Sequence, residues 1–159
     1  MKKYLLLILA ASSGLHAETF NVATTSELRV ALNTAATNGE DDTIILADGT
    51  YKTTDDGEGT FIYLSNEINS ITLQGSSSNN VILSGDYNDQ VLNLQSTQRS
   101  TFTIEKLSIT DGNATNGAGL YFHSQLMNVK NALFKENIST SRGGAITYNY
   151  VSSNHLNID

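Results

Sequence analysis

The spacing of hydrophobic residues changes once along the chain, from helical spacing to alternation. A narrow apolar stripe at i, i+3, i+4 and i+7 is typical of one face of an amphipathic helix. The stripe consists of Leu28, Ala31, Leu32 and Ala35. Thr24 is followed three residues later by Glu27, a capping-box pattern, and Gly39 can end a helix in the left-handed conformation. We therefore predict a short capping helix over about 25–38.

Beyond residue 42 the apolar residues alternate with polar ones in short runs about ten residues apart. Turns rich in Gly, Asn, Ser and Asp separate these runs, which is typical of strands. The first predicted strands cover 43–47, 61–64, 71–73, 81–83, 91–94 and 102–104. An antiparallel sandwich or barrel is one way to arrange them. No Asn-Gly or Asp-Gly pair joins neighbouring strands of matching length, so the pattern favours a parallel coil.

A glycine-containing phrase occurs twice, which supports the coil. Asn-Gly-Ala-Gly-Leu-Tyr-Phe at 116–122 returns 26 residues later as Arg-Gly-Gly-Ala-Ile-Thr-Tyr at 142–148. A repeat of roughly 20 to 50 residues indicates a solenoid. Corners of such a coil need positive φ or close backbone approach, which Gly tolerates best. We assign these corners to Gly117, Gly119, Gly143 and Gly144.

The residues around these corners have predicted structural roles of their own. We expect Leu120 and Ile146 to point inward and stack on each other in consecutive turns of the coil. Asn137 follows an inward-facing Phe134, and its amide is placed to bond backbone groups at a bend. Gly112 occupies the equivalent position in the preceding turn. The same repeat therefore predicts both a packed interior and specific corner residues.

At these residues the chain resembles a known family. Phe134-x-x-Asn137 with Gly143-Gly144-Ala145-Ile146 is similar to the FxxN and GGAI repeats of the polymorphic outer membrane protein family. The broader class that it resembles is the right-handed parallel β-helix, or pectin-lyase-like, proteins of bacterial surfaces. Residues 26–51 also resemble the usual N-terminal segment of these proteins. The resemblance implies an all-β solenoid behind a short N-terminal capping α-helix. Its class contains adhesins, autotransporter passengers, lyases and hydrolases, so it bears more on fold than on function.

The two ends of the chain carry further expectations. Residues 1–17 have the layout of a secretory signal peptide, with a basic start, an apolar segment and Ala17 at a plausible cleavage point. The apolar segment is shorter than the ~20 residues that span a bilayer. We expect an exported protein, extracellular or on the bacterial cell surface or outer membrane, in which 18–159 form one β-helix domain with its rungs over about 43–159. Residues 155–159 resemble the first strand of another rung, so we expect a coil that is incomplete at its C-terminus. The chain would then be a fragment of a longer protein. Any attachment to a membrane would occur only through the missing C-terminal parts.

Charge and cysteine content narrow the possible partners. Without residues 1–17, 7 basic side chains accompany 16 acidic ones, a net charge near −9. Nucleic-acid binding depends largely on Lys and Arg, so this balance disfavours it. The chain has no cysteine, so packing and backbone hydrogen bonds must stabilise the fold without disulfides.

The acidic residues in two loops are weak candidates for a cation site. Asp55, Asp56 and Glu58 lie in one loop, and Asp86 and Asp89 lie in another. Closely spaced carboxylates can hold Ca²⁺. The same residue types are also what solvated turns require. We expect no cofactor other than a possible Ca²⁺ ion.

Few other side chains are candidates for catalysis or ligand binding. We expect Arg29 to run along the helix surface with its charged head in water. A serine elbow, an HExxH motif and a phosphate-binding loop do not occur, and no catalytic residue is assigned. An outward sugar-stacking face of tyrosines is a further hypothesis, although tyrosine is common in any strand. Its members would be Tyr63, Tyr121, Tyr148 and Tyr150.

Together these observations favour a secreted or cell-surface β-helix module. We interpret it as a non-catalytic scaffold, similar to a passenger or adhesin, that presents loops to glycans or surface proteins. The alternative is the N-terminal part of a polysaccharide lyase or glycoside hydrolase of the pectin-lyase-like fold.

Overall fold

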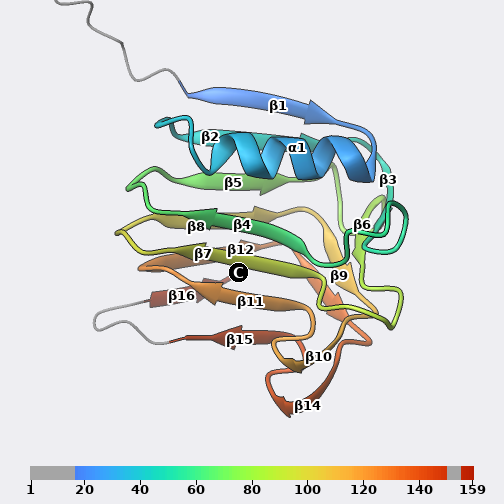
Figure 1. The fold of residues 1–159 in the computed structure, drawn as a ribbon. Helices are drawn as coiled ribbons and strands as arrows, with labels where there is room; N and C mark the ends of the chain where they lie inside the picture. Colours follow the sequence, from blue (N-terminus) through green and yellow to red (C-terminus); the bar gives the residue numbers. More distant parts are fainter. Residues whose placement is uncertain (1–16, 150–154) are drawn as a thin grey trace, which may run out of the picture.

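The chain folds as a right-handed parallel β-solenoid of about five turns, with one helix at its N-terminal end (Figure 1). This computed structural model describes residues 17–149 and 155–159. The predicted fold class is thereby confirmed. The predicted signal peptide, except Ala17, lies outside the described residues, as does Tyr150.

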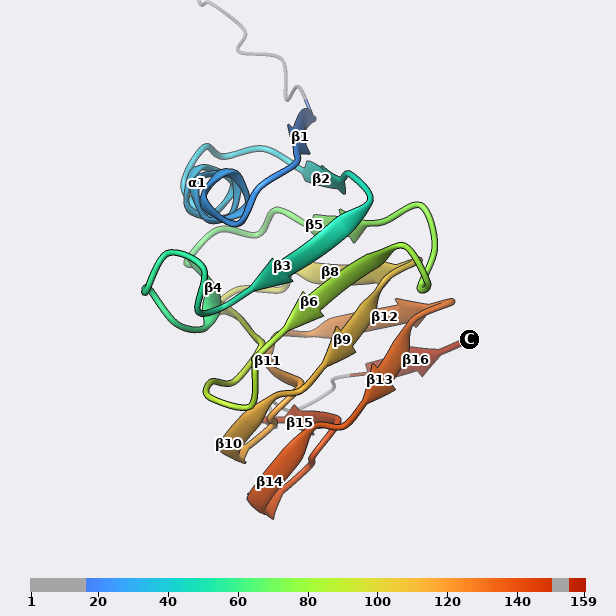
Figure 2. The same cartoon turned by 90° about the vertical axis from the view of Figure 1, so that its right-hand side faces the viewer.

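Three parallel sheets form the walls of the solenoid, and a short two-stranded ladder extends from it. Sheet A contains β1 (Glu18–Val22), β2 (Asp42–Leu46), β5 (Ile71–Gln74), β8 (Thr101–Glu105), β12 (Leu126–Lys130) and β16 (His155–Ile158). Sheet B, which faces the viewer in Figure 2, contains β3 (Gly49–Lys52), β6 (Val81–Ser84), β9 (Ser108–Thr110) and β13 (Leu133–Lys135). Sheet C contains β4 (Phe61–Ser65), β7 (Leu92–Ser96), β11 (Leu120–His123) and β15 (Ile146–Tyr148). The ladder pairs β10 (Asn113–Asn116) with β14 (Ile138–Arg142).

In-register stacking builds the core from equivalent positions in successive turns. Leu120 of β11 pairs with Leu92 of β7 on one side and with Ile146 of β15 on the other. Phe61 of β4 occupies the same position one turn earlier. Phe61, Leu92 and Leu120 are fully buried, whereas Ile146, in the last strand of sheet C, is half-buried. Burying one apolar side chain of this size stabilises the fold by about 1.5–3 kcal/mol, so each turn contributes to a continuous core.

Helix α1 (Thr25–Ala35) covers the N-terminal end of that core (Figure 1). The side chain of Thr24 accepts a hydrogen bond from the Glu27 amide, and the Glu27 carboxylate bonds the Thr24 amide in return, a complete capping box. The predicted stripe is the buried face of the helix. The helix ends at Ala35, about three residues earlier than predicted. Gly39, with φ +78°, turns the chain after the helix has already ended.

The glycine phrase forms a corner that alternates positive φ with close backbone approach. Gly117 and Gly143 have φ values of +59° and +57°. A Cβ at Gly119 would lie 2.6 Å from the Ala145 carbonyl oxygen. A Cβ at Gly144 would lie 2.6 Å from the Asn137 carbonyl oxygen. Gly117 and Gly143 are therefore required by conformation as well as by space, and Gly119 and Gly144 by space alone.

The Asn137 amide links two turns of the coil. Its Oδ1 accepts a hydrogen bond from the Gly112 backbone N–H at 2.8 Å, and its Nδ2 donates to the Ile109 carbonyl at 2.9 Å. Ile109 belongs to β9, and Gly112 lies just after that strand. The half-buried side chain of Asn137 thus ties the end of β9 to the following turn of the coil.

Candidate functional site

The acidic loop between β3 and β4 is held against the helix by an arginine. Arg29 Nε donates to Asp56 Oδ2 at 2.8 Å, and the two side chains are only 14% and 18% exposed. The guanidinium also donates to the backbone carbonyls of Thr53, Gly59 and Thr60. Its carbon lies 4.7 Å from the centre of the Phe61 ring, a cation–π contact. The expectation that Arg29 extends into water was wrong, because these acceptors and the ring together surround its head.

The other predicted Ca²⁺ ligands are also engaged by protein donors or lie apart. Asp55 accepts hydrogen bonds from the Thr25 hydroxyl at 2.9 Å and from the Lys52 amide at 3.1 Å. Asp86 accepts from Lys52 Nζ at 3.0 Å and from the Thr54 hydroxyl at 2.9 Å. Asp89 lies beside Gly59. Among the described residues, none of these three aspartates, nor Asp56 or Glu58, joins a set of three carboxylates with oxygens close enough to share an ion.

The Arg29–Asp56 pair predicts a specific pH dependence. The hydrogen bond from Arg29 lowers the pKa of the Asp56 carboxyl below its usual 3.8. A lowered pKa means that the pair contributes its full stability above pH ~4 and loses it as the pH falls through the lower, folded-state pKa. We expect Asp56→Asn to flatten the acid limb of a plot of unfolding free energy against pH, measured by urea denaturation. An acid limb as steep as in the wild type would contradict this role.

A ladder of three carboxylates follows the edge of sheet B. Asp111 and Glu136 directly follow β9 and β13, and Asp86 lies two residues after β6; their φ values are +56°, +55° and +51°. Asp111 Oδ2 accepts from the Thr110 hydroxyl at 2.7 Å and from the Ser84 hydroxyl at 3.1 Å. Such positive φ is uncommon outside glycine, and aspartate adopts it more readily than most residues.

The ladder carboxyls are held in their charged form. The hydrogen bond from Lys52 lowers the pKa of Asp86, and that from Tyr87, at 2.7 Å, lowers the pKa of Glu136. Burial raises the pKa of Asp111, but hydrogen bonds led by that of Thr110 outweigh it and leave the pKa below its usual value. A general acid at neutral pH needs a raised pKa instead. This ladder therefore suits a structural role.

The predicted outward face of tyrosines is wrong for two of its members. Tyr63 is 1% exposed and packs edge-on against Phe102, with ring centres 5.5 Å apart. Tyr148 stacks on Phe122 at 4.9 Å. Because side chains alternate along a strand, these residues share the inward parity of their strands. Tyr121 has the opposite parity and lies on the outer surface, where its hydroxyl accepts from Asn149 Nδ2 at 2.8 Å.

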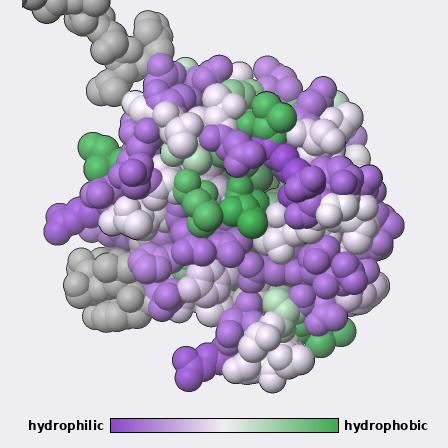
Figure 3. Space-filling model, viewed as in Figure 1, coloured by the Kyte–Doolittle hydropathy of each residue, from purple (hydrophilic) through white to green (hydrophobic). Residues whose placement is uncertain are grey.

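The outer surface of sheet C brings together uncharged side chains from four strands, and we call it the amide face. Parallel pairing aligns them in two rows across the strands. One row contains Ile62, Asn93, Tyr121 and Thr147, and the other contains Leu64, Gln95 and His123. Ile62 and Leu64 are 44% and 57% exposed. They produce an apolar patch over β4 at the centre of the view in Figure 3.

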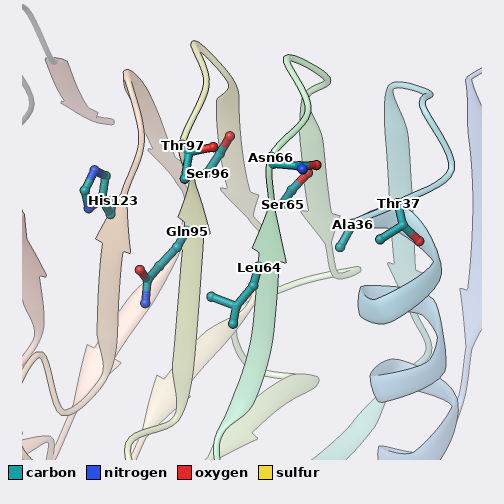
Figure 4. A pocket seen from close by; sticks show the side chains of 9 residues that line it. All are labelled: Ala36, Thr37, Leu64, Ser65, Asn66, Gln95, Ser96, Thr97 and His123. Carbon is teal, nitrogen blue, oxygen red and sulfur yellow. The ribbon is translucent and has the colours of Figure 1, made fainter.

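A hollow lies across the second row of the amide face. It has a volume of about 380 Å³ and is bounded by the end of α1 and the ends of β4, β7 and β11 (Figure 4). Its lining residues are Ala36, Thr37, Leu64, Ser65, Asn66, Gln95, Ser96, Thr97 and His123. A second hollow, lined in part by Asn93 and Tyr121, shares Gln95 with it. The two hollows meet at Gln95, and we call the pair the groove.

The groove is lined by polar side chains that suit hydrogen bonding to an uncharged polar ligand. The carboxamides of Asn93 and Gln95, joined by a 2.9 Å hydrogen bond, offer both donors and acceptors. Leu64 and Tyr121 add apolar and aromatic surface beside them. None of the residues that line the two hollows is Asp, Glu, Lys or Arg. Sequence reasoning missed this face because its amides are ordinary strand residues until the register aligns them.

The fold defines the class to which the chain belongs: it is a parallel β-solenoid protein. No protein-family model, curated protein or solved structure matches the chain. In the described part of the chain, no helix is both long and apolar enough to span a membrane.

Proposed function

We propose that this protein is a non-catalytic β-solenoid module, exported to the cell surface or the extracellular space, whose amide face binds neutral glycans. Presentation at the cell surface fits the predicted signal peptide and the resemblance to surface β-helix proteins. The observation that carries the glycan assignment is the uncharged groove on a chain with a strong excess of acidic residues. A negatively charged polymer would be repelled by the rest of the surface, whereas a neutral sugar would not.

The groove offers the contacts that sugars use. Sugar hydroxyls form hydrogen bonds with carboxamides, and the apolar C–H face of a pyranose packs on aromatic or aliphatic surface. Gln95 contributes to both hollows, so a chain of several sugar units lying across the strands would contact it repeatedly. The rigid sheet holds these groups without further ordering on binding, which favours affinity.

Binding to neutral oligosaccharides tests the proposal directly. Purified protein should bind members of a panel of neutral gluco-, galacto- and manno-oligosaccharides in isothermal titration calorimetry. Gln95→Ala should weaken binding about tenfold, because losing one or two hydrogen bonds costs about 1.4 kcal/mol. The matched control is Gln74→Ala, since Gln74 points outward from sheet A, away from the groove. Equal losses in the two variants, or no binding to any neutral glycan, would contradict the proposal.

The enzymatic alternative is tested in parallel. Incubation with acidic polysaccharides and Ca²⁺, followed by absorbance at 235 nm for unsaturated products, detects a lyase. Appearance of such products would replace the binding proposal with the lyase hypothesis.

A further inference from the structure

A cluster of carboxylates at the N-terminal end of the solenoid lies outside the acidic loops considered above. Glu18 and Asp42 are the first residues of β1 and β2 and face each other in register. Glu40 lies in the turn that leads into β2. One oxygen from each of the three carboxylates lies within 4.8 Å of the others. Strand pairing and the turn after α1 thus bring Glu18 beside Glu40 and Asp42, which lie 22 and 24 residues later in the sequence.

Asn38 holds the cluster in place. Its Nδ2 donates to Glu18 Oε2 at 3.2 Å and to Asp42 Oδ1 at 3.1 Å. Its Oδ1 accepts from the Glu40 backbone N–H at 3.1 Å. The next residue, Gly39, has its N–H bonded to Glu67 Oε2 at 3.0 Å. The turn therefore has a defined shape, and Asn38 positions the carboxylates of Glu18 and Asp42.

One oxygen of the cluster lacks a protein partner. Asp42 is only 4% exposed, and its Oδ2 has no hydrogen-bond partner among the described residues. Leaving a buried carboxylate oxygen unpaired is strongly unfavourable, because water no longer solvates it. In the described part of the chain, the ion pairs formed by Lys and Arg involve Asp56, Asp86 and Glu136, all outside this cluster. The cluster therefore combines mutual repulsion with an unsatisfied buried acceptor.

We propose that Glu18, Glu40 and Asp42 form a binding site for a divalent cation, with Ca²⁺ as the ion that fits best. Every ligand atom is oxygen, which selects hard cations. A buried carboxylate beside an exposed Glu18 and a half-exposed Glu40 leaves one side of the site open to water molecules that complete the coordination. Ca²⁺ accepts such irregular oxygen shells more readily than Mg²⁺, which requires near-octahedral geometry.

The location gives the site a structural consequence. The ion would join β1 to β2 and to the turn after α1, the elements that close the N-terminal end of the core. Burial of Asp42, together with the charges of Glu18 and Glu40, raises the pKa of its carboxyl against the opposing hydrogen bond from Asn38. A bound cation would remove this electrostatic penalty and stabilise the folded form over the unfolded one.

Calcium-dependent stability tests the site. The purified protein, treated with chelator and dialysed, should unfold at a higher temperature when Ca²⁺ is added at constant ionic strength, and calorimetry should give one binding site. Glu40→Gln should weaken Ca²⁺ binding at least tenfold while leaving the ion-free fold intact, because the Glu40 side chain forms no hydrogen bond with the residues that the structure describes. Absence of a shift in the wild type would overturn the proposal.

Two further variants separate the site from general charge effects. Glu58→Gln makes the same change in the acidic loop between β3 and β4 and should retain the full response to Ca²⁺. Asp42→Asn should lose the response and, without Ca²⁺, be at least as stable as the wild type, since it removes the unpaired buried charge. A response lost equally in Glu58→Gln, or retained in both Glu40→Gln and Asp42→Asn, would place the ion elsewhere and overturn the assignment.

Discussion

Gly143→Ala is expected to destabilise the protein by about 3 kcal/mol. The residue has φ +57°, which an L side chain rarely adopts. In addition, an added Cβ would overlap the Ile146 carbonyl oxygen and the Thr147 hydroxyl, well inside contact distance. The backbone cannot relieve this overlap without disturbing the β11–β15 pairing next to it. The free energy of unfolding, from urea denaturation followed by circular dichroism, measures the effect.

Gly57→Ala separates the two causes. Gly57 also has positive φ, +78°, but an added Cβ there has no heavy atom within 4 Å. Its substitution should therefore cost only the conformational strain, about 1 kcal/mol. If both variants lost the same stability, close packing at the corner of the repeated phrase would not be the reason for its glycine.

Arg29→Ala is the second large effect, an expected loss of about 2–3 kcal/mol. The substitution removes the partner of Asp56, whose side chain is 18% exposed. It leaves three backbone carbonyls of the loop between β3 and β4 without this donor. It also removes the cation that covers the Phe61 ring. Chemical denaturation should show the loss, and limited proteolysis should show faster cleavage within 53–60, the loop that Arg29 holds.

Two comparisons define what Arg29 contributes. Lys52→Ala removes a second ion pair, with Asp86, whose side chains are 45% and 40% exposed. Because solvent screens an exposed pair, this substitution should cost much less stability than Arg29→Ala. Arg29→Lys keeps the charge but loses the planar, multidentate geometry, so it should recover only part of the stability. Full recovery by lysine would show that charge alone, and not the set of carbonyl contacts, stabilises the loop.

Most strands of the coil were predictable because their inward side chains are apolar. The strand at 71–73 was predicted from Ile71 and Leu73, and both are fully buried. The strands β1, β3, β10, β12 and β14 were not predicted. β14 has the sequence Ile-Ser-Thr-Ser-Arg and carries no alternating apolar pattern. It is extended because it pairs with β10, one turn earlier. The residues of β14 and their immediate neighbours in sequence do not reveal this pairing.

The candidate sites were less accessible to prediction than the fold. Asp56 was recognised as chemically interesting, but its partner Arg29 lies 27 residues earlier, on the helix. The amide face and the Glu18–Glu40–Asp42 cluster are also assembled from separate turns. The misassigned Tyr63 shows the complementary error, because its residue type suggested a surface role while its parity in β4 placed it in the core.

The order of residues alone thus specified a capped parallel coil, because helix capping, strand alternation and glycine corners are local preferences repeated in each turn. Only the three-dimensional stacking decided which side chains meet across turns, since the register of each strand depends on the turn before it. The tertiary structure determines whether a carboxylate meets an arginine, as Asp56 in its loop does, or two other carboxylates, as Asp42 does. The repeated glycine phrase could be recognised from the sequence alone, whereas the amide face and the carboxylate cluster became visible only in the tertiary structure.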